Sequence, residues 1–469
     1  MKKTIIGAVA AVALTLMTSA SIPAVLAMTV QQAAVNINVA HGGEVISPLA
    51  YGMNTAVWDG NLVSNTVVQR LKQIGIKLLR FPGGSYADTF HFKDYTNSFD
   101  QFMQLSRQVG AVPLLTVNYG SGTPLEAASW VAYTKAHHET ALWEIGNEIY
   151  GNGTYQNNAW ETDLHSPKGP AAYAKNALAF ITAMKKVDKN AQIGVVATIP
   201  GVWPSGIAPY WDRTMLPIVG KKIDFIVIHW YAQNPGQEDD ATLLASTSSI
   251  PAYMSQLHQY LQKYCGANAK HIQIFLDETN SVSSNPGKQV MSVVNALFAA
   301  NDYNLWLQNG VQNVSWWDLH NGKNAGNVSP NLFGNATYGD YGILSNGDPG
   351  EPPINTPTAS FWGLRMMDLF AQPRDRYVQA TSNQLFLSAY AVKSPKNGLS
   401  FMLVNTSPDT AYAVSLKGIK TSRTTWYEQY TYGEQGTSIT NQKTHMLGNR
   451  LLVGPYSMVV IKAQRGLAA

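Results

Sequence analysis

Two glutamates stand at the ends of short apolar segments that lie far apart in the sequence. Glu148 closes the run Leu-Trp-Glu-Ile-Gly-Asn-Glu that begins at Leu142, and Glu278 closes an apolar run that begins at Ile272. Cleavage of a glycosidic bond needs two carboxyl groups: one protonates the departing oxygen, and the other attacks the anomeric carbon or activates water. The residue types therefore predict glycosidic chemistry if the fold brings both segments to one cleft.

The elements that would bring them together are repeated strand and helix units. Between about Leu49 and Phe370, short runs rich in β-branched and aromatic residues alternate with amphipathic helical stretches. The predicted strands are Tyr51–Ala56, Lys77–Phe81, Val112–Val117, Leu142–Asn147, Gln192–Thr198, Phe225–Trp230, Gln273–Asp277 and Val314–Trp317. The helix candidates include Asn65–Ile74, Ala171–Val187, Pro251–Tyr264, Gly287–Asn309 and Thr358–Phe370. Eight such units predict a (β/α)8 TIM barrel, an α/β fold whose catalytic groups lie where strands meet the loops that follow them.

A doubly wound sheet is the competing architecture for this alternation. It would need a glycine-rich phosphate-binding turn after the first strand. Gly83-Gly84 follows the second strand and lacks that spacing. The strand count and the missing turn favour the barrel.

The pattern of the sequence changes after Pro373. Strand-like runs follow one another there, separated by Gly, Ser, Asn and Pro turns: Leu385–Val392, Leu399–Asn405, Ala411–Leu416, Thr424–Tyr430, Arg450–Val453 and Met458–Ala463. This pattern predicts a β-sandwich, which the alternating stretch Ala34–Val39 is expected to join. The expected divisions are residues 28–48 for the N-terminal strand, 49–372 for the catalytic barrel and 373–469 for the β-sandwich.

The first residues have the pattern of a secretory signal. Lys2 and Lys3 precede an apolar run and small residues that end at Ala27, so residues 1–27 are expected to be removed and the protein to be secreted. The run is shorter than the roughly 20 apolar residues of a membrane span. The net charge of +4, with dispersed basic residues, argues against nucleic acid as a partner. Cys265 is the only cysteine, which excludes a disulfide within the chain, and no spacing predicts a metal site or a cofactor.

These segments together resemble the large clan of retaining barrel glycosidases, whose acid/base follows an Asn after the fourth strand and whose nucleophile ends the seventh. Asn147-Glu148 and Glu278 match in strand order and residue type. Within this clan the sequence most resembles the α-L-arabinofuranosidase type. The resemblance lies in Leu-Arg-Phe-Pro-Gly-Gly-Ser at 79–85, Phe-His-Phe at 90–92 and Gly-Asn-Glu at 146–148. The resemblance covers about residues 30 to 465 and implies that Glu148 is the acid/base and Glu278 the nucleophile.

The resemblance implies roles for polar residues at other strand ends. Arg80 would hold the nucleophile region by charge-assisted hydrogen bonds. Asn147 would bond the sugar hydroxyl beside the anomeric carbon. His229 and Tyr231 would line the site, with Tyr231 orienting Glu278. Asn118, at the end of the third strand, is a further candidate for a sugar contact.

Two tryptophans are candidates for contact with a sugar ring. The resemblance implies that Trp317 forms a stacking floor, whereas its neighbour Trp316 should face the helices. Trp58 follows the first strand, where the loops of a barrel gather around the cleft, so it is a candidate platform as well.

Strand alternation separates the remaining carboxylates from the catalytic pair. Glu144 lies on the same side as Glu148 but deeper, which predicts a structural carboxylate paired with a buried Arg or His. Asp277 should point away from Glu278 by the same alternation.

The expected mechanism is double displacement with retention of configuration. It predicts carboxyl groups about 5–5.5 Å apart, against roughly 6.5–9.5 Å in an inverting enzyme. It also predicts a raised pKa for Glu148, from partial burial and from the nearby anionic Glu278.

The expected substrate is a plant or microbial poly- or oligosaccharide. The activity expected first is that of an α-L-arabinofuranosidase. The sequence departs from that type where Thr279-Asn280 follows the nucleophile in place of a Trp, and in the long loop Leu319–Tyr341. An endo-β-glycanase (glucanase or xylanase) and a β-exoglycosidase of the same clan stay open as alternatives. A non-catalytic carbohydrate-binding protein, the rival class, would be expected to lack one of the two carboxylates.

Overall fold

The computed structural model describes residues 29–154, 159–202, 208, 210–395, 398–419, 426–433, 437–445 and 450–463. The predicted signal segment, residues 1–27, lies outside the described residues. None of the described helices has the length and apolarity required to cross a bilayer.

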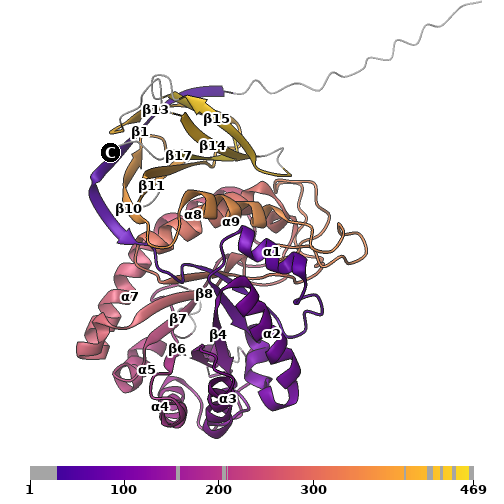
Figure 1. Ribbon diagram of the computed structural model, residues 1–469, viewed down its shortest axis with the longest axis vertical. Helices are drawn as coiled ribbons and strands as arrows, with labels where there is room; N and C mark the ends of the chain where they lie inside the picture. The colour runs from indigo at the N-terminus through magenta and orange to yellow at the C-terminus, as the bar shows by residue number, and fades with distance from the viewer. Residues whose placement is uncertain are drawn as a thin grey trace, which may run out of the picture.

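Eight parallel strands form a closed barrel in chain order (Figure 1). They are β2 (Tyr51–Asn54), β3 (Leu78–Phe81), β4 (Val112–Val117), β5 (Leu142–Ile145), β6 (Gln192–Val196), β7 (Phe225–Gln233), β8 (Gln273–Val282) and β9 (Asn313–Trp316). β2 pairs with both β3 and β9, which closes the ring. Most strand residues are buried because helices cover the outside of the barrel and side chains fill its inside.

Helices surround the barrel. They are α1 (Asn65–Gln73), α2 (Thr96–Val109), α3 (Pro124–Ala136), α4 (Pro170–Val187), α5 (Trp211–Val219), α6 (Asp240–Ser246), α7 (Ile250–Cys265), α8 (Val293–Gln308) and α9 (Ala359–Phe370). Short 3-10 turns are η1 (Gly84–Thr89), η2 (Phe92–Tyr95), η3 (Ile149–Gly151), η4 (Thr247–Ser249), η5 (Gly266–Lys270) and η6 (Lys288–Met291). The hydroxyls of Ser64 and Thr123 accept hydrogen bonds from backbone N–H groups in the first turns of α1 and α3, which fixes where those helices begin.

Nine strands form the second domain. They are β1 (Thr29–Val45), β10 (Arg376–Ser382), β11 (Leu387–Ser394), β12 (Gly398–Asn405), β13 (Thr410–Lys417), β14 (Trp426–Gly433), β15 (Thr440–His445), β16 (Arg450–Val453) and β17 (Ser457–Ala463). Their order is β15-β14-β17-β12-β11-β10-β1-β13-β16, with β1 antiparallel to β10 and parallel to β13. The predicted fold class, a TIM barrel with a mainly C-terminal β-domain, is confirmed. The β-domain differs from the predicted β-sandwich in one detail. Its strands form one continuous sheet that curls until β16 contacts β12.

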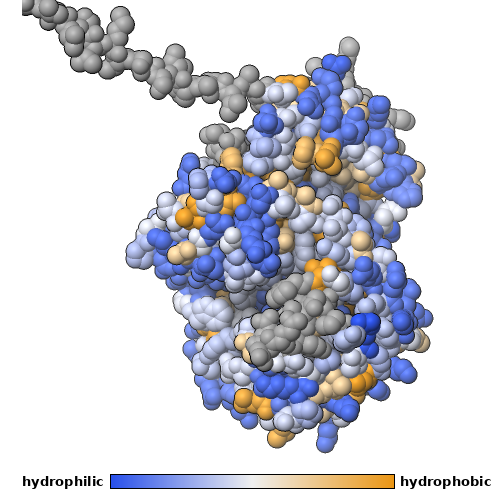
Figure 2. Space-filling model, turned by 180° about the vertical axis from the view of Figure 1, so that it is seen from behind, coloured by the Kyte–Doolittle hydropathy of each residue, from blue (hydrophilic) through white to orange (hydrophobic). Residues whose placement is uncertain are grey.

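Helix α8 joins the two domains. It contacts β8 and β9 on the barrel side and β1, β12 and β17 on the other, so it is buried on nearly every face. Two of its polar residues are paired across the interface: Asn301 accepts from the Tyr390 hydroxyl at 2.9 Å and Asn304 from the Tyr377 hydroxyl at 3.0 Å. Figure 1 shows the β-domain resting on α8 and α9. On the face seen in Figure 2, hydrophobic residues form small scattered patches among hydrophilic ones.

Candidate active site

Glu148 and Glu278 lie together at the carboxyl end of the barrel. Glu148 follows β5 by three residues, and Glu278 lies within β8. One carboxylate oxygen of each glutamate and one ring nitrogen of His229 all lie within 4.8 Å of one another. Only 9% of Glu148 and 5% of Glu278 is exposed. The two segments predicted to carry chemistry therefore meet at one place, where both carboxyl groups are largely shielded from solvent.

The backbone turns sharply before Glu148. Gly146 has a φ of 74°, and Glu148 itself has a φ of 39°, in the left-handed region. A side chain at position 146 would meet Ile149 and Tyr119, because a Cβ there would lie 2.7 Å and 2.8 Å from their nearest atoms. A residue other than glycine is strained in the left-handed region and stays there only when its surroundings hold it. The turn thus needs glycine at 146 and fixes the direction of the Glu148 side chain.

Two donors hold Glu278. Arg80 Nη1 donates to its Oε1 at 2.6 Å, and the Tyr231 hydroxyl donates to its Oε2 at 2.8 Å. Arginine does not lose its charge in proteins, so Glu278 has a permanent positive partner. Tyr231 contacts Glu278 as the resemblance implied.

Three different donors hold Glu148. His229 Nδ1 lies 2.8 Å from its Oε1, which also accepts from the Tyr150 hydroxyl at 3.0 Å. The Trp160 indole N–H donates to Oε2 at 2.7 Å. The closest charged partner of Glu148 is therefore a histidine, which can lose its proton, whereas that of Glu278 is an arginine, which cannot. His229 Nδ1 also lies 3.4 Å from Glu278 Oε2.

Arg80 is the centre of a buried charge network. Its side chain makes two hydrogen bonds to Glu144, at 2.9 Å and 3.1 Å, and Nη2 donates to Asn147 Oδ1 at 2.7 Å. Burial alone would lower the pKa of Arg80, but Glu144, Asp277 and Glu278 outweigh it and raise the pKa well above its ordinary value. Glu144 is thus paired with a buried arginine, as predicted, and its pKa is raised to about 7, chiefly by burial.

Asp277 corrects one prediction, since it does not point away from the site. Its Oδ2 lies 3.1 Å from Arg80 Nε and its Oδ1 lies 3.1 Å from His229 Nε2. The reason is a β-bulge: β7 and β8 pair Ile228 with Leu276 but His229 with Glu278, which leaves Asp277 as the extra residue. A bulge breaks strict alternation, so two consecutive side chains reach the barrel interior.

The pKa of Glu148 is the second correction. Burial raises it, but the hydrogen bond and charge of His229 and the hydrogen bonds from Trp160 and Tyr150 hold it below its ordinary value. Burial lowers the pKa of His229, and the carboxylates of Glu278 and Asp277 reverse this effect and raise the pKa well above its ordinary value. These opposite pKa shifts favour His229 as the holder of the proton that the pair shares.

Glu161 is a site residue that the sequence pattern did not reveal. Its Oε1 accepts from Asn147 Nδ2 at 2.9 Å and from the Ser85 hydroxyl at 2.6 Å. Burial, with the charges of Asp88 and Glu148, raises its pKa to about 10, so it is a neutral acid at neutral pH. Arg80 and Glu161 together fix both ends of the Asn147 amide. Glu161 lies in an irregular loop, where no strand end or spacing pointed to it.

The remaining predicted residues differ in their surroundings. Trp317 is half-buried, and its ring lies beside Gly84, where a Cβ would meet it at 2.8 Å. Trp316 is fully buried against Phe298 and Tyr303 of α8, as predicted. Trp58 is 52% exposed and meets Tyr86 edge-on.

Asn118 is engaged by its own loop. Its Oδ1 accepts from the backbone N–H groups of Ser121 and Gly122, and its Nδ2 donates to the Ser121 hydroxyl at 3.0 Å. The amide is therefore part of the turn that follows β4.

Two side-chain groups among the described residues have the spacing of metal ligands: Glu144, His229 and Asp277, and Glu148, His229 and Glu278. Both share His229, and Arg80 already supplies a permanent positive charge to Glu144, Asp277 and Glu278. The arginine occupies the electrostatic position that a cation would take.

No protein-family model matches the chain. The chain is similar to the probable alpha-L-arabinofuranosidase C of Aspergillus niger, with 25% identity over 188 residues, 32% of this chain and 35% of that protein. It is also similar to an intracellular exo-alpha-L-arabinofuranosidase of Bacteroides ovatus, with 22% identity over 276 residues, 46% of this chain and 50% of that protein. The match spans between about a third and a half of the length of these curated relatives.

Solved structures share the architecture over most of the chain. An alpha-L-arabinofuranosidase from Thermotoga maritima, solved with arabinose, superposes with a TM-score of 0.72 at 19% identity, over 92% of this chain and 100% of that one. A family 44 xyloglucanase from Paenibacillus polymyxa superposes with a TM-score of 0.65 at 12% identity, over the same shares. The predicted resemblance to barrel glycosidases of the arabinofuranosidase type is confirmed in fold and in partial sequence similarity.

Proposed function

We propose that this protein is a retaining glycoside hydrolase in which Glu278 is the nucleophile and Glu148 the acid/base. The observation that carries the proposal is the approach of the two carboxylates to within 4.8 Å at the end of the barrel where catalytic groups gather. An inverting enzyme needs roughly 6.5–9.5 Å between them to admit water, so the spacing favours double displacement.

The partners of the two glutamates support this division of roles. Arg80 and Tyr231 hold Glu278 in one orientation, and Arg80 places a permanent positive charge beside it, as suits an attacking carboxylate. Glu148 shares a proton with His229, which lies one hydrogen bond away at 2.8 Å. Such a titratable partner can hold the proton that the acid/base first gives and later takes back.

The reaction then has two steps. A Glu278 oxygen bonds to the anomeric carbon while the bond to the leaving oxygen breaks, and that oxygen takes the proton held by the Glu148–His229 pair. Water next attacks the anomeric carbon and gives its proton back to Glu148. The ester bond to Glu278 breaks, and the sugar leaves with its original configuration.

Neighbouring residues would bind the sugar. The Asn147 amide is fixed by Arg80 and Glu161, and its position beside Glu148 in sequence supports a bond to the hydroxyl next to the anomeric carbon. Trp317, half-buried beside Gly84, offers an aromatic face for the ring.

We propose an α-L-arabinofuranoside as the substrate, in a plant or microbial poly- or oligosaccharide. The curated relatives from Aspergillus niger and Bacteroides ovatus are arabinofuranosidases, and the similarity to them supports this substrate class. An endo-β-glycanase is the second candidate, because a xyloglucanase shares the fold over the same fraction of the chain. Hydrolysis of nitrophenyl α-L-arabinofuranoside with little action on intact glucan and xylan is the expected result; the reverse preference would favour the glycanase.

A leaving-group comparison tests the two roles. Glu148→Gln should lose about 10²–10⁴-fold in kcat on a glycoside with a poor leaving group and far less on a dinitrophenyl glycoside, whose departure needs little protonation. Glu278→Gln should lose activity on both. Equal losses for the two variants on both substrates would contradict the assignment.

We also propose that the protein is exported, on the N-terminal pattern alone. N-terminal sequencing of protein recovered from the culture medium should begin at about Met28. Recovery of the protein inside the cell, with residues 1–27 still attached, would overturn the proposal of export.

A further inference from the structure

The 3-10 turn η1, which follows β3, contacts several parts of the candidate active site. At its start, the ring of Trp317 lies against Gly84. The hydroxyl of the next residue, Ser85, donates to Glu161 Oε1 at 2.6 Å. Asp88 lies near the end of η1 and is fully buried. The two displacement steps do not involve Asp88, so its contacts point to a different task.

The Asp88 side chain accepts hydrogen bonds from the backbone at the ends of two other barrel strands. Its Oδ2 accepts from the N–H of Asn147, after β5, at 3.0 Å, and its Oδ1 from the N–H of Gly120, after β4, at 3.1 Å. A Cβ at position 120 would lie 2.7 Å from Asp88, so glycine lets that loop approach this closely. One side chain thus connects the loops that follow β3, β4 and β5.

The hydrogen bond from Asn147 lies in the sharp turn before Glu148. Gly146 on one side of Asn147 has a φ of 74°, and Glu148 on the other side has a φ of 39°. A strained backbone of this kind persists only where its surroundings hold it. Asp88 supplies such a contact at the residue between the two.

Asn147 is held by its side chain as well as by its backbone. Arg80 Nη2 donates to its Oδ1 at 2.7 Å, and its Nδ2 donates to Glu161 Oε1 at 2.9 Å. An amide group has a second N–H and a second lone pair, and these stay available to a substrate hydroxyl. Arg80 and Glu161 therefore set the rotation of the amide, whereas Asp88 sets the position of the main chain that carries it.

We infer that Asp88 is a positioning residue, which places the Asn147 amide against the sugar hydroxyl beside the anomeric carbon by holding the Asn147 backbone. Asp88 acts through Asn147 and not by contact with the substrate. A hydrogen bond to that hydroxyl strengthens in the transition state, so Asp88 should matter chiefly for substrates that carry the hydroxyl. The inference rests on the proposed function, because it requires a glycoside as the substrate.

A pair of substrates tests the inference in the full chain. The probes are nitrophenyl α-L-arabinofuranoside and its 2-deoxy counterpart, which lacks the hydroxyl beside the anomeric carbon. Asp88→Ala should lower kcat/KM about 100-fold on the first probe and at most about tenfold on the second. Losses of equal size on both probes would refute a role through Asn147.

Two further variants separate the hydrogen bonds of Asp88 from its packing. Asp88→Leu keeps the branched shape of the side chain but has no acceptor, so it should lose as much as Asp88→Ala. Asp88→Asn keeps one acceptor oxygen and should recover part of the loss. Melting temperatures check that each variant is folded. Equal activity of the Leu and Asn variants would overturn the inference, and this comparison decides the matter even if the Ala variant does not fold.

A double-mutant cycle tests the connection between the two residues. In a chain that carries Asn147→Ala, adding Asp88→Ala should change kcat/KM by less than about twofold, because the group that Asp88 positions is already gone. Additive losses would show that Asp88 acts by another route and would contradict the inference.

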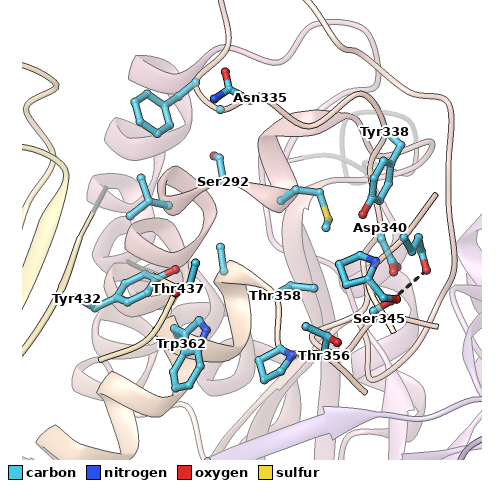
Figure 3. A pocket seen from close by; sticks show the side chains of 18 residues that line it. Ser292, Asn335, Tyr338, Asp340, Ser345, Thr356, Thr358, Trp362, Tyr432 and Thr437 are labelled. Carbon is cyan, nitrogen blue, oxygen red and sulfur yellow. Dashed lines mark hydrogen bonds between the residues drawn. The ribbon is translucent and has the colours of Figure 1, made fainter. Parts of the chain in front are cut away.

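Asp340→Ala is the matched control. Figure 3 shows Asp340 among the side chains of a cavity that neither catalytic glutamate lines. Asp340 is 2% exposed, and its Oδ1 accepts from the backbone N–H groups of Gly322 and Gly342, so it resembles Asp88 in burial and in partners. Any loss from this substitution should be the same on both probes. A selective loss on the hydroxylated probe would mean that the comparison does not report on Asn147, and the inference would fall.

The outcomes distinguish this inference from the proposed function. If the unaltered chain cleaves no glycoside, the proposed function fails and the inference fails with it. If it cleaves only β-glycans, the arabinofuranoside proposal fails, and the Asn147→Ala cycle measured on that polymer decides the role of Asp88. If it cleaves the arabinofuranoside and the Asp88 variants lose nothing, or lose equally on both probes, the inference alone fails.

Discussion

At the scale of single residues, the difference between an arginine and a histidine partner distinguishes the two glutamates. Arg80 gives Glu278 a permanent counter-charge at 2.6 Å, and His229 gives Glu148 a removable one at 2.8 Å. Two carboxylates that lie close together thus have different surroundings, which supports the different tasks proposed for them. The catalytic proton belongs to the Glu148–His229 pair and not to either group alone.

Replacement of His229 tests this sharing. In His229→Gln the proton must reside on Glu148 alone, without a partner whose pKa is raised well above its ordinary value. The alkaline limb of the kcat/KM profile should therefore move to lower pH, because the site loses its catalytic proton earlier. An alkaline limb that stays in place would show that His229 holds no part of the catalytic proton.

Glu161 permits a test of a neutral acid. Because its pKa is raised to about 10, chiefly by burial, Glu161→Gln replaces one neutral group by another and should keep most activity. Glu161→Ala leaves Asn147 Nδ2 without its acceptor and should lower kcat by about 10- to 100-fold through misplacement of the amide. Steady-state kinetics of both variants on one substrate make the comparison; equal damage would mean that the charge of Glu161 is needed.

At the scale of elements, the bulge in β8 is the feature on which the charge network depends. It turns both Asp277 and Glu278 inward, so that Arg80 and His229 each meet two or more carboxylates. Asp277→Asn removes one charge from this buried set and should lower the free energy of unfolding by about 3 kcal/mol. Urea denaturation measures this change in the free energy of unfolding. Asp100→Asn, on an exposed helix position, is the matched control and should change stability by only a few tenths of a kcal/mol. Similar small changes for both would mean that Asp277 is not part of a cooperative network.

Sequence reasoning located the barrel strands well because each is a short buried run of apolar residues with a polar end. All eight begin within one residue of the expected start, from β2 at Tyr51 to β9 at Asn313. The bulge could not be foreseen, since it adds one residue to a run that still looks regular. β15, Thr-Asn-Gln-Lys-Thr-His, has no apolar alternation and was not predicted, because its strand state comes from pairing with β14.

At the scale of the whole molecule, the sites combine residues from parts of the chain that no local pattern relates. The approach of Glu148 and Glu278 was predictable, since both glutamates stand at the ends of apolar runs and the barrel places all strand ends on one face. Glu161 was not, because the position of a loop residue depends on tertiary packing. The curl of the β-domain into one sheet belongs to the same class of features.

The buried acids predict how stability depends on pH. Burial raises the pKa of Glu144 and Asp212 to about 7, of Asp302 to about 8 and of Glu161 to about 10. The unfolded chain releases these protons near pH 4 while the folded chain keeps them, so stability should fall as pH rises from about 5 to about 8. Melting temperatures across this range check the slope. Asp302→Asn, which is neutral at every pH, should make the slope shallower; an unchanged slope would show that the buried Asp302 carboxyl does not contribute to it.

The most direct test of the central claim is the configuration of the first product. With methanol as the acceptor, the methyl glycoside cannot change its anomeric form after release, and proton NMR identifies it. Double displacement through Glu278 predicts a methyl glycoside with the configuration of the substrate. A product of opposite configuration would show a single displacement and would contradict the assignment of Glu148 and Glu278 as a retaining pair.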